Sequence, residues 1–495
     1  MKAFRYSLIP LGTGLIGAAV LAILAWPVVS AEWQTCYPDW VAALYLPAGD
    51  EVAVRDGALS QRPPEPVVEV DPRGELTELA KLPADAPETY GSWPNFRGWN
   101  FDGVSDDDVK LLDRLDSQLK PIWTVTLGNG YAGPAIYNSR VYLMDYDLAA
   151  KRNVLRCFGF ADGKELWRRG FTRVIKQQHG VSRTVPAVND DVVIAITPKC
   201  AVMACNPITG KWLWGIDMVA KYGTTVPKWY TGQCPLLDMD RVILAPGGTK
   251  LMVSIEAATG KVIWETPNDL GWKMTHSSIL PMSFAGKSLY VYVASRGVVG
   301  VDAETGKLAF AYDGWRVRTA AVPTPVELGD GKLLLTGGYG AGGQIIRLVE
   351  SNGRIDAKRI KTYTPEEFSC YQQTPTRVED LVFTVLPKVG AVSCQLACME
   401  TSGELLWRSG PAWTFGWGPW MVADGKILLV DDDGRLTMVK IASKGFKSLG
   451  RIQLPGLSHE SWAPMALVDG RLLVRDATTM ICVDLRKKGD DDGHE

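Results

Sequence analysis

The sequence has almost no net charge, few histidines and little helical patterning. Its 53 lysines and arginines nearly balance 55 aspartates and glutamates, so the net charge of −2 gives no reason to expect nucleic acid as a partner. Only 4 residues are histidine. Helical periodicity is scarce after residue 120, and the glycine-rich run at 337–343 has no helix pattern behind it, which argues against a phosphate-binding loop. The scarcity of helical patterning favours an all-β chain.

Charge is also missing from one long stretch near the start, between Arg5 and Glu32. A secretory signal core usually spans ~7–15 apolar residues, whereas ~20 suffice to cross a bilayer. We therefore expect residues 1–31 to be either a signal peptide, cleaved after the small residues 29–31, or a signal-anchor helix. Both forms place the rest of the chain outside the cytoplasm, because the basic end stays inside.

Two further segments lack the pattern of a packed domain. Residues 47–90 are rich in proline and acidic residues, a composition typical of an extended tether. We therefore interpret residues 32–92 as a linker and residues 487–495 as an acidic, solvated tail.

What the chain does contain is a repeated motif, and residues 204–214 (ACNPITGKWLW) are its clearest copy. Weaker copies recur about every 45–50 residues, each with a glycine four residues before a closing aromatic. A glycine at a fixed position indicates a hairpin turn with positive φ, and the aromatic is then free to pack against the next unit. The turn glycines are Gly163, Gly210, Gly260, Gly306 and Gly403, and the closing aromatics are Trp123, Trp167, Trp214, Trp264, Phe310 and Trp407.

This period, with four strand-like runs per unit, is typical of a β-propeller. The strand around Trp123 has no partner before it and the final strand, residues 480–484, has none behind it, so we expect the two to pair and close the ring. Degenerate copies are expected around Gly353, with Ala357 in the closing position, and near Leu449. The result is eight blades over residues 93–486. An X-Pro step is expected before each inner strand, at Pro134, Pro186, Pro235, Pro281, Pro325, Pro375, Pro419 and Pro464.

The motif resembles propellers with pyrroloquinoline quinone-like (PQQ-like) repeats, whose pattern is a small residue, Asp, Thr-Gly-Lys and a closing Trp. The lead-in at residues 93–98 (WPNFRG) looks like that of envelope members common in planctomycete-type bacteria. The resemblance implies a quinoprotein alcohol dehydrogenase-like fold and a place in the bacterial cell envelope, on the periplasmic side, secreted or anchored in the membrane by an uncleaved N-terminal helix. One branch of the family holds quinone-dependent alcohol and sugar dehydrogenases. The other holds non-catalytic propellers, such as the propeller lipoprotein of the outer-membrane β-barrel assembly machinery.

The dehydrogenase branch implies a calcium or lanthanide ion, an Asp base, an Arg beside the quinone and usually an adjacent Cys-Cys bridge. This sequence has no adjacent cysteine pair and no Cys-x-x-Cys-His haem site, and no metal ligands can be assigned to numbered positions. Residues 431–434 (DDDG) lack the distal Glu of a calcium loop and indicate a hairpin turn. We therefore expect a non-catalytic scaffold without a cofactor or catalytic residue. The alternative is a PQQ-dependent oxidoreductase with calcium at the channel mouth.

The connections from each outer strand to the next inner strand should lie on one face of the propeller, around the channel mouth. Their histidines could bind a metal or an anion, or simply satisfy local backbone groups. Their cations favour an anionic ligand, and their aromatics could stack on a glycan or anchor another envelope protein. The alternative is a solvated surface with ordinary blade packing. The predicted binding face consists of Tyr131, His179, Arg183, Tyr230, His276, Arg318, Tyr371, Trp417, His459 and Trp462.

Nine cysteines are an odd number for an exported protein, so at least one is unpaired or forms an intermolecular bond. Cys200 with Cys205, and Cys394 with Cys398, are chemically feasible bridges that strand geometry must decide. Cys205 and Cys398 each lie nine residues before a closing Trp, so we expect them in the same layer of different blades.

Overall fold

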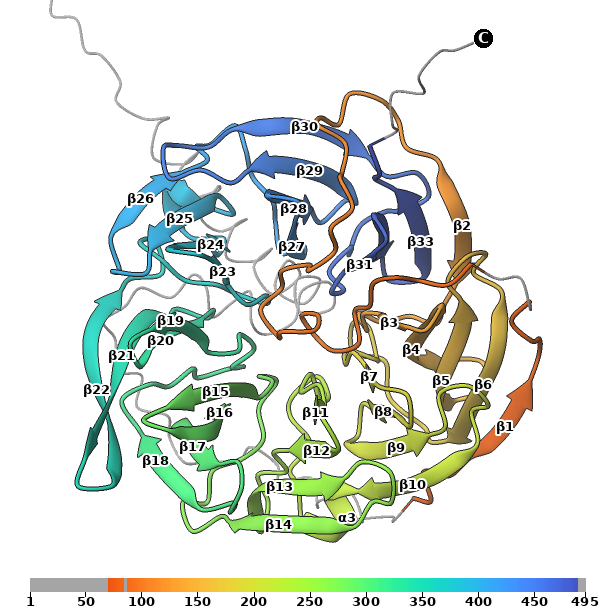
Figure 1. Cartoon of the computed structure of the whole chain (residues 1–495), viewed down its shortest axis with the longest axis horizontal. Helices are drawn as coiled ribbons and strands as arrows, with labels where there is room; N and C mark the ends of the chain where they lie inside the picture. The colour runs from red at the N-terminus through yellow and green to blue at the C-terminus, as the bar shows by residue number, and fades with distance from the viewer. Residues whose placement is uncertain (1–69, 84–86, 488–495) are drawn as a thin grey trace, which may run out of the picture. The chain divides into compact units, whose positions relative to one another are not determined.

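The structure, a computed structural model, describes residues 70–83 and 87–487. Eight antiparallel sheets surround a central axis, so the chain is an eight-bladed β-propeller, as predicted (Figure 1). The expected signal or anchor segment, most of the linker and all but the first residue of the tail lie outside the described residues, and the domain boundaries stay predictions. Within the described ranges, no helix is long and apolar enough to cross a membrane.

The first four blades are built from consecutive strands, ordered from the axis outward. They are β3 (Ala135–Tyr137), β4 (Arg140–Asp147), β5 (Arg152–Gly159) and β6 (Glu165–Thr172); β7 (Ala187–Val188), β8 (Val193–Ile196), β9 (Ala201–Cys205) and β10 (Trp212–Asp217); β11 (Leu236–Asp238), β12 (Arg241–Leu244), β13 (Lys250–Glu256) and β14 (Val262–Pro267); and β15 (Leu280–Phe284), β16 (Lys287–Ala294), β17 (Gly297–Asp302) and β18 (Leu308–Tyr312). A short helix, α3 (Met218–Tyr222), follows β10.

Blades five to seven continue the pattern. They are β19 (Val326–Gly329), β20 (Lys332–Gly337), β21 (Gly342–Ser351) and β22 (Arg354–Tyr363); β23 (Thr376–Val378), β24 (Leu381–Val385), β25 (Leu396–Glu400) and β26 (Leu405–Arg408), with the 3-10 turn η1 (Gly390–Val392); and β27 (Trp420–Ala423), β28 (Lys426–Val430), β29 (Arg435–Lys440) and β30 (Ser448–Gln453). The predicted prolines lie at or within two residues of the start of each inner strand.

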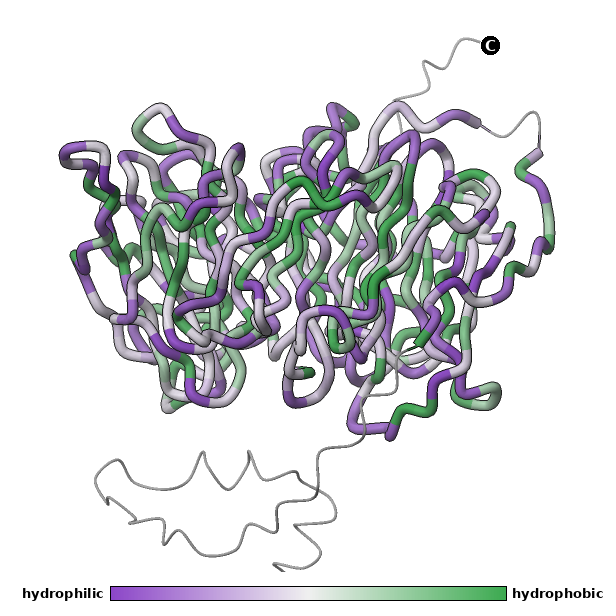
Figure 2. Tube along the Cα trace, turned by 90° about the horizontal axis from the view of Figure 1, so that it is seen from below, coloured by the Kyte–Doolittle hydropathy of each residue, from purple (hydrophilic) through white to green (hydrophobic). Residues whose placement is uncertain are grey.

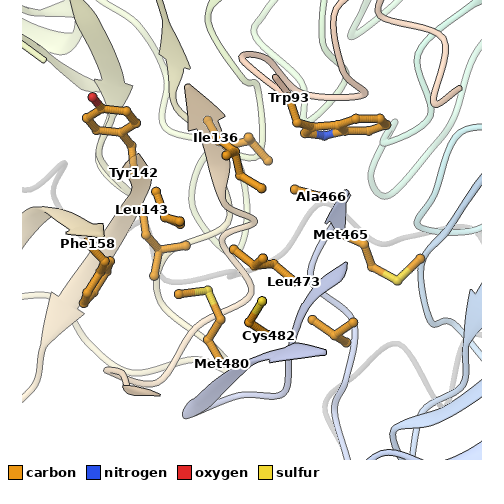
Figure 3. Packing of buried hydrophobic residues seen from close by; sticks show 14 of the residues in the cluster. Trp93, Ile136, Tyr142, Leu143, Phe158, Met465, Ala466, Leu473, Met480 and Cys482 are labelled. Carbon is orange, nitrogen blue, oxygen red and sulfur yellow. The ribbon is translucent and has the colours of Figure 1, made fainter. Parts of the chain in front are cut away.

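Blade 8 joins the two ends of the ring. It contains β31 (Ala466–Val468), β32 (Arg471–Arg475), β33 (Thr479–Asp484) and, as its outer strand, β2 (Pro121–Thr126). Trp123 lies opposite Cys482, which confirms the predicted closure. Figure 3 shows Leu473, Met480 and Cys482 of this blade packed toward blade 1. In Figure 2, hydrophobic residues follow the strands and hydrophilic residues gather in the loops at both ends.

The closing aromatics wedge neighbouring blades together, as the repeat predicted. The indole nitrogens of Trp123, Trp167, Trp214, Trp264 and Trp407 donate to a carbonyl in the next blade at 2.7–3.3 Å. The five turn glycines all have positive φ. In four of the five turns, a Cβ on the glycine would meet the preceding blade's indole ring within 3 Å. Glycine is therefore required both by the turn and by the ring.

Blade 5 departs from the predicted repeat. The turn does lie at Gly353, but the closing position is not Ala357. In the other blades a register shift leaves one residue unpaired just before the closing aromatic, and in β22 this residue is Ile360. The closing position is therefore Lys361, whose Nζ donates to the carbonyl of Gly403 in blade 6 at 2.6 Å. The hairpin is longer than the others, and its aromatic, Tyr363, lies two residues beyond the closing position and donates to the same carbonyl of Gly403 at 2.7 Å, so spacing alone misplaced it.

The cysteines are structural core residues. All eight in the described part of the chain are free and buried, so neither of the two considered bridges forms; Cys36 lies outside that part. Cys205 and Cys398 do not share a register, contrary to expectation. Cys398 lies opposite Trp407 and Cys205 opposite Trp212, because the turn of blade 6 is one residue shorter. Burial raises the pKa of both thiols to about 12, which makes them unreactive.

An acidic strand that the sequence did not indicate covers the outer edge of blade 1. It is β1 (Glu75–Glu78), which pairs antiparallel with β6. Glu75 lies 3.2 Å from the guanidinium of Arg152. The guanidinium of Arg169 donates to the carbonyls of Arg73 and Gly74 at 2.8 and 3.1 Å. Main-chain pairing and these cations hold the strand.

The lead-in at residues 93–104 runs inside the ring, along the inner strands. Trp93 pairs with Ile136 of β3, and the carbonyl of Pro94 accepts a hydrogen bond from Val188 of β7. Further on, Val104 bridges to Val422 of β27. Figure 1 shows this orange segment crossing the centre, and Figure 3 shows Trp93 near Ile136.

Arg97 fastens the middle of this lead-in to blade 6. Its guanidinium donates to the carbonyls of Thr374 and Pro375 at 2.9 and 3.0 Å, and to those of Phe101 (3.1 Å) and Asp102 within the lead-in. Burial lowers its pKa to about 10. The lead-in therefore fills one end of the channel and ties distant blades together.

Candidate functional site

At the other end of the channel, six aromatic side chains and one arginine form a closed circuit, which we call the mouth ring. Successive ring centroids lie 4.7–6.4 Å apart, so each ring contacts the next. In order they are Trp229, Tyr339, Tyr371, Trp417, Trp462 and Tyr131. All except Tyr339 come from outer-to-inner connections; Tyr339 comes from the turn between β20 and β21.

Arg183 closes the circuit. Its guanidinium lies 5.1 Å from the ring centroid of Tyr131, and its Nε donates to the carbonyl of Trp229 at 2.7 Å. Tyr131 is brought there by a backbone hydrogen bond to the carbonyl of Ser182. Burial lowers the pKa of Arg183, while nearby tyrosines and Glu460 oppose this shift. Lys228 adds a second cation, with its Nζ 4.5 Å from the ring centroid of Trp229, so the mouth keeps two cations against a wall of aromatic rings.

Two carboxylates anchor the aromatic rings from behind. Asp432 accepts hydrogen bonds from the backbone N–H of Trp417 at 2.7 Å and from the indole of Trp462 at 2.8 Å. Glu460 accepts one from the Tyr131 hydroxyl at 2.7 Å. Burial raises the pKa of Asp432, and burial together with Glu460 raises that of Tyr131. Both carboxylates are thus engaged by protein donors.

Several residues of the mouth have left-handed backbone conformations. Trp229, Tyr230 and Tyr339 have φ of +64°, +74° and +56°, and Glu460 and His179 have +69° and +55°. Bulky residues rarely adopt this region, and such strain of ~1–3 kcal/mol each clusters at functional sites. These conformations therefore lower the stability of the fold while they place the side chains at the mouth.

The three histidines predicted near the mouth do not meet. His276 is 8% exposed, and burial and the charge of Arg183 lower its pKa to about 3. His459 is exposed and contacts Asp433 at 3.0 Å. Burial and Arg183 also lower the pKa of His179. Within the described residues, no three His, Cys, Asp or Glu side chains are grouped to hold a metal ion.

The remaining predicted residues lie at the margin of the mouth ring. Tyr230 donates to the carbonyl of Lys176 and packs against Tyr146 and Val181. Arg318 is exposed on the β18–β19 connection, and no hydrogen bond or ring contact joins it to the mouth ring in the described part of the chain. Of the ten predicted residues, the mouth ring unites Tyr131, Arg183, Tyr371, Trp417 and Trp462.

Sequence reasoning missed the groups that organise the site. Tyr339 sits in the glycine-rich run at 337–343, to which the sequence assigned no function, and Asp432 in the turn at 431–434. Glu460 follows a predicted histidine but carried no signal of its own. Only a three-dimensional arrangement shows that these loops converge.

A groove of ≈840 Å³ lies at the opposite end, between the lead-in and blade 8. Asp106, Asp107 and Asp469 line it together with the exposed Trp99. Asp107, just after the lead-in, accepts a hydrogen bond from the backbone N–H of Gly470, and Asp469 accepts those of Tyr90 and Gly91, just before the lead-in. These carboxylates therefore dock the segments on either side of the lead-in onto blade 8.

The donor set at the mouth does not fit a quinone held by a divalent cation. Neighbouring rings of the mouth ring touch, so no planar group fits between them. Asp432 and Glu460, the carboxylates that anchor the rings, each use one oxygen to accept hydrogen bonds from protein donors and so offer at most one further oxygen each. A quinone-bound calcium needs several free oxygen ligands.

Comparison with known proteins places the chain in a family. The sequence pattern of the family described as "Outer membrane protein assembly factor BamB" matches residues 108–227 and 224–397, more than half of the chain. "Uncharacterized protein RP232" of Rickettsia prowazekii (strain Madrid E) is 28% identical over 133 residues, which are 26% of this chain and 30% of that protein. The chain thus matches less than a third of that relative's length.

Solved structures show the same fold at low identity. A europium-containing methanol dehydrogenase has a TM-score of 0.56 and 14% identity, covering 78% of this chain and 89% of its own. The quinohemoprotein alcohol dehydrogenase from Comamonas testosteroni has a TM-score of 0.54 and 12% identity, covering 83% of each chain. With its repeats, its ring closure and this match, the chain belongs to the BamB family of propellers with PQQ-like repeats.

Proposed function

We propose that this chain is a non-catalytic binding scaffold of the bacterial cell envelope, which holds a segment of another envelope protein on the mouth ring. One observation carries the proposal: a closed circuit of six aromatic rings and Arg183, with members fixed in strained backbone conformations. The family match supports it, because the family is described as an assembly factor.

The composition of the mouth ring is that of a protein-binding surface. Trp, Tyr and Arg supply most of the binding energy in protein interfaces, since their rigid side chains bury large areas at low entropic cost. The rings are in contact and partly buried, so they are already ordered before a partner arrives. The partner segment should carry aromatic or aliphatic side chains for the rings and an acidic group for Arg183.

Substitution of Trp417 tests this role. Trp417 stacks on Tyr371 at 5.1 Å with an interplanar angle of 2°, so Trp417→Ala removes the centre of the circuit. We expect capture of partners from envelope extracts to fall at least about tenfold, the usual effect of losing an interface hot spot. Trp413→Ala is the matched control: Trp413 lies in the same connection but packs on Phe446 and Arg451 outside the mouth ring. Equal capture by both variants would refute the assignment.

An anionic glycan is the alternative occupant of the same surface. If a glycan array binds the wild-type chain and Trp417→Ala abolishes that binding while protein capture is unchanged, the protein partner is wrong.

A PQQ-dependent oxidoreductase is the alternative function. Calorimetric titration of the full chain with pyrroloquinoline quinone and calcium tests it, and the scaffold proposal expects no saturable heat. Saturable binding with quinone-dependent oxidation of an alcohol would overturn the scaffold function.

The envelope location rests on residues 1–31. Sequencing the N-terminus of the native protein from fractionated cells would separate a cleaved from an anchored form, and recovery in the cytoplasmic fraction would contradict both.

A further inference from the structure

The outer strand of blade 5 has a free and unusually exposed edge. β22 is ten residues long and pairs only with β21. Residues 358–362 are all exposed, on both faces of the strand, which no other outer strand shows over five successive residues. Figure 1 shows the β21–β22 hairpin reaching out beside β18 at the rim. Within the described residues, β22 has no backbone hydrogen bond to any strand other than β21.

This edge is strongly cationic. β22 carries Arg354, Lys358, Arg359 and Lys361 against the single acidic Asp356. Lys361 is tied to the carbonyl of Gly403, but Lys358 and Arg359 form no ion pair within the part of the chain that the structure describes. Their charges are therefore available to an acidic ligand.

Blade 1 shows how this fold fills such an edge. There the outer strand β6 is also cationic, and the acidic strand β1 adds to it as a fifth strand. The carboxylate of Glu75 pairs with Arg152, and Arg169 donates to two carbonyls of the added segment. The added strand is thus held by a main-chain ladder, by hydrogen bonds from Arg169 of β6 to carbonyls, and by one ion pair between Glu75 and Arg152 of β5.

The exposure of one equivalent residue in β6 and β22 shows whether another strand covers the outer edge of the blade. The register shift before the closing residue leaves Leu166 unpaired in β6 and Ile360 unpaired in β22. Leu166 is 4% exposed, and its carbonyl accepts hydrogen bonds from Leu79 and Ala80 of the segment that follows β1. Ile360 is 51% exposed. The equivalent residues of blades 2, 3 and 8, Leu213, Ile263 and Ile122, are 39%, 44% and 42% exposed, so blade 5 shares an uncovered apolar residue with them and differs in its cations and in the exposure of residues 358–362.

We propose that the outer edge of β22 is a docking site for an extended acidic segment of a partner protein, which adds to blade 5 as a fifth strand. The segment should alternate acidic with apolar residues, because it must meet Lys358 and Arg359 and cover Ile360. Pairing of the β22 edges of two copies of the chain does not fit, since it would oppose like charges. The edge shares no residue with the mouth ring, so the two sites can fail separately.

A peptide that copies residues 74–80 (GELTELA) is the probe. We expect the full chain to bind it saturably, with hydrogen-exchange protection of residues 354–362. A peptide with both glutamates replaced by glutamine should bind more weakly, and a peptide N-methylated at the four positions that match Glu75–Glu78 should not bind, because it cannot donate to the edge. Protection confined to β6 would mean that the peptide only replaces β1, and would refute the proposal.

The double variant Lys358→Glu/Arg359→Glu tests whether these two cations bind the acidic peptide. Reversal of two exposed charges that meet acidic partners should weaken peptide binding about tenfold or more. Lys211→Glu/Lys261→Glu, which reverses two exposed lysines in the turns of blades 2 and 3, should bind as the wild type does.

The cations could instead only keep other strands away from the edge, as lysines on edge strands do. In that case the peptide does not bind at 1 mM, or both double variants bind it equally, and either result overturns the proposal. If Lys358→Glu/Arg359→Glu fails to fold, the affinity of the wild-type chain for the peptide is compared at low and high salt instead. An affinity that does not change with salt would overturn the proposal.

Discussion

Gly260 tests how tightly the aromatic wedges between blades are fitted. It has a φ of +76°, and a Cβ on it would lie 2.6 Å from Cγ of Trp214. Trp214 is 7% exposed, and its indole donates to the carbonyl of Ala257 at 2.7 Å. The ring therefore cannot move aside without losing a buried hydrogen bond. Gly260→Ala meets both an unfavourable backbone conformation and a blocked contact.

Gly271 is the matched control, because it has a φ of +62° and nothing within 4 Å of its added Cβ. The left-handed conformation costs an alanine ~1–2 kcal/mol at either position. Overpacking against Trp214 adds ~1–3 kcal/mol at Gly260 only. We expect the free energy of unfolding to fall by ~1–2 kcal/mol in Gly271→Ala and by ~2–5 kcal/mol in Gly260→Ala.

Urea denaturation followed by far-UV circular dichroism measures the difference, provided that both variants unfold with the same dependence on urea. Equal losses in the two variants would refute the reasoning, because they would show that Trp214 yields to a methyl group at no cost. The glycine would then serve only the turn.

Two other substitutions test the interior of the ring. Arg97→Met leaves the carbonyls of Thr374 and Pro375 without their donor, so the same urea assay should show a loss of ~2–4 kcal/mol; an unchanged midpoint would mean that Arg97 does not hold the lead-in. The pKa of His276, about 3, lies below its ordinary ~6.5, so between these pH values the unfolded chain binds a proton that the folded chain does not. As the pH falls from 6 to 4, the wild type should lose up to ~1.4 kcal/mol per pH unit more than His276→Gln, and parallel stability curves would contradict this.

The ring could be predicted from the sequence because its units repeat. A closing aromatic such as Trp214 needs a glycine turn in the next blade, so two residue types recur at a fixed spacing that any single copy would not reveal. The blade that joins the two chain ends was predictable for the same reason. The strand of Trp123 has no partner strand before it in the sequence, and the strand of Met480 has none after it, so the two strands pair with each other. Where the contact is made by other side chains, Lys361 and Tyr363 in place of an indole, the pattern failed.

Structural features that occur only once in the chain were not predictable from the sequence. β1 and the lead-in carry no repeat, and their partners lie far away in sequence: Arg97 holds Thr374, and Glu75 holds Arg152. The candidate site shows the same limit. Spacing placed Trp417 and Trp462 on one face, but their contact depends on Asp432, which joins two loops through its carboxylate.

These single features also decide where a ligand can bind. The lead-in fills one end of the channel along the inner strands, and at the other end the rings of the mouth ring touch one another. A ligand therefore meets this propeller on its surfaces. The two surfaces differ in chemistry: the mouth presents ordered aromatic rings around Arg183, whereas the rim at β22 presents an open backbone edge with free cations. An interaction at the mouth should depend little on salt and strongly on the loss of an indole, and one at the rim should show the reverse. A partner that engages both would gain affinity from their linkage, so variants at Trp417 and at Lys358 should then reduce its binding by more together than the sum of their separate effects.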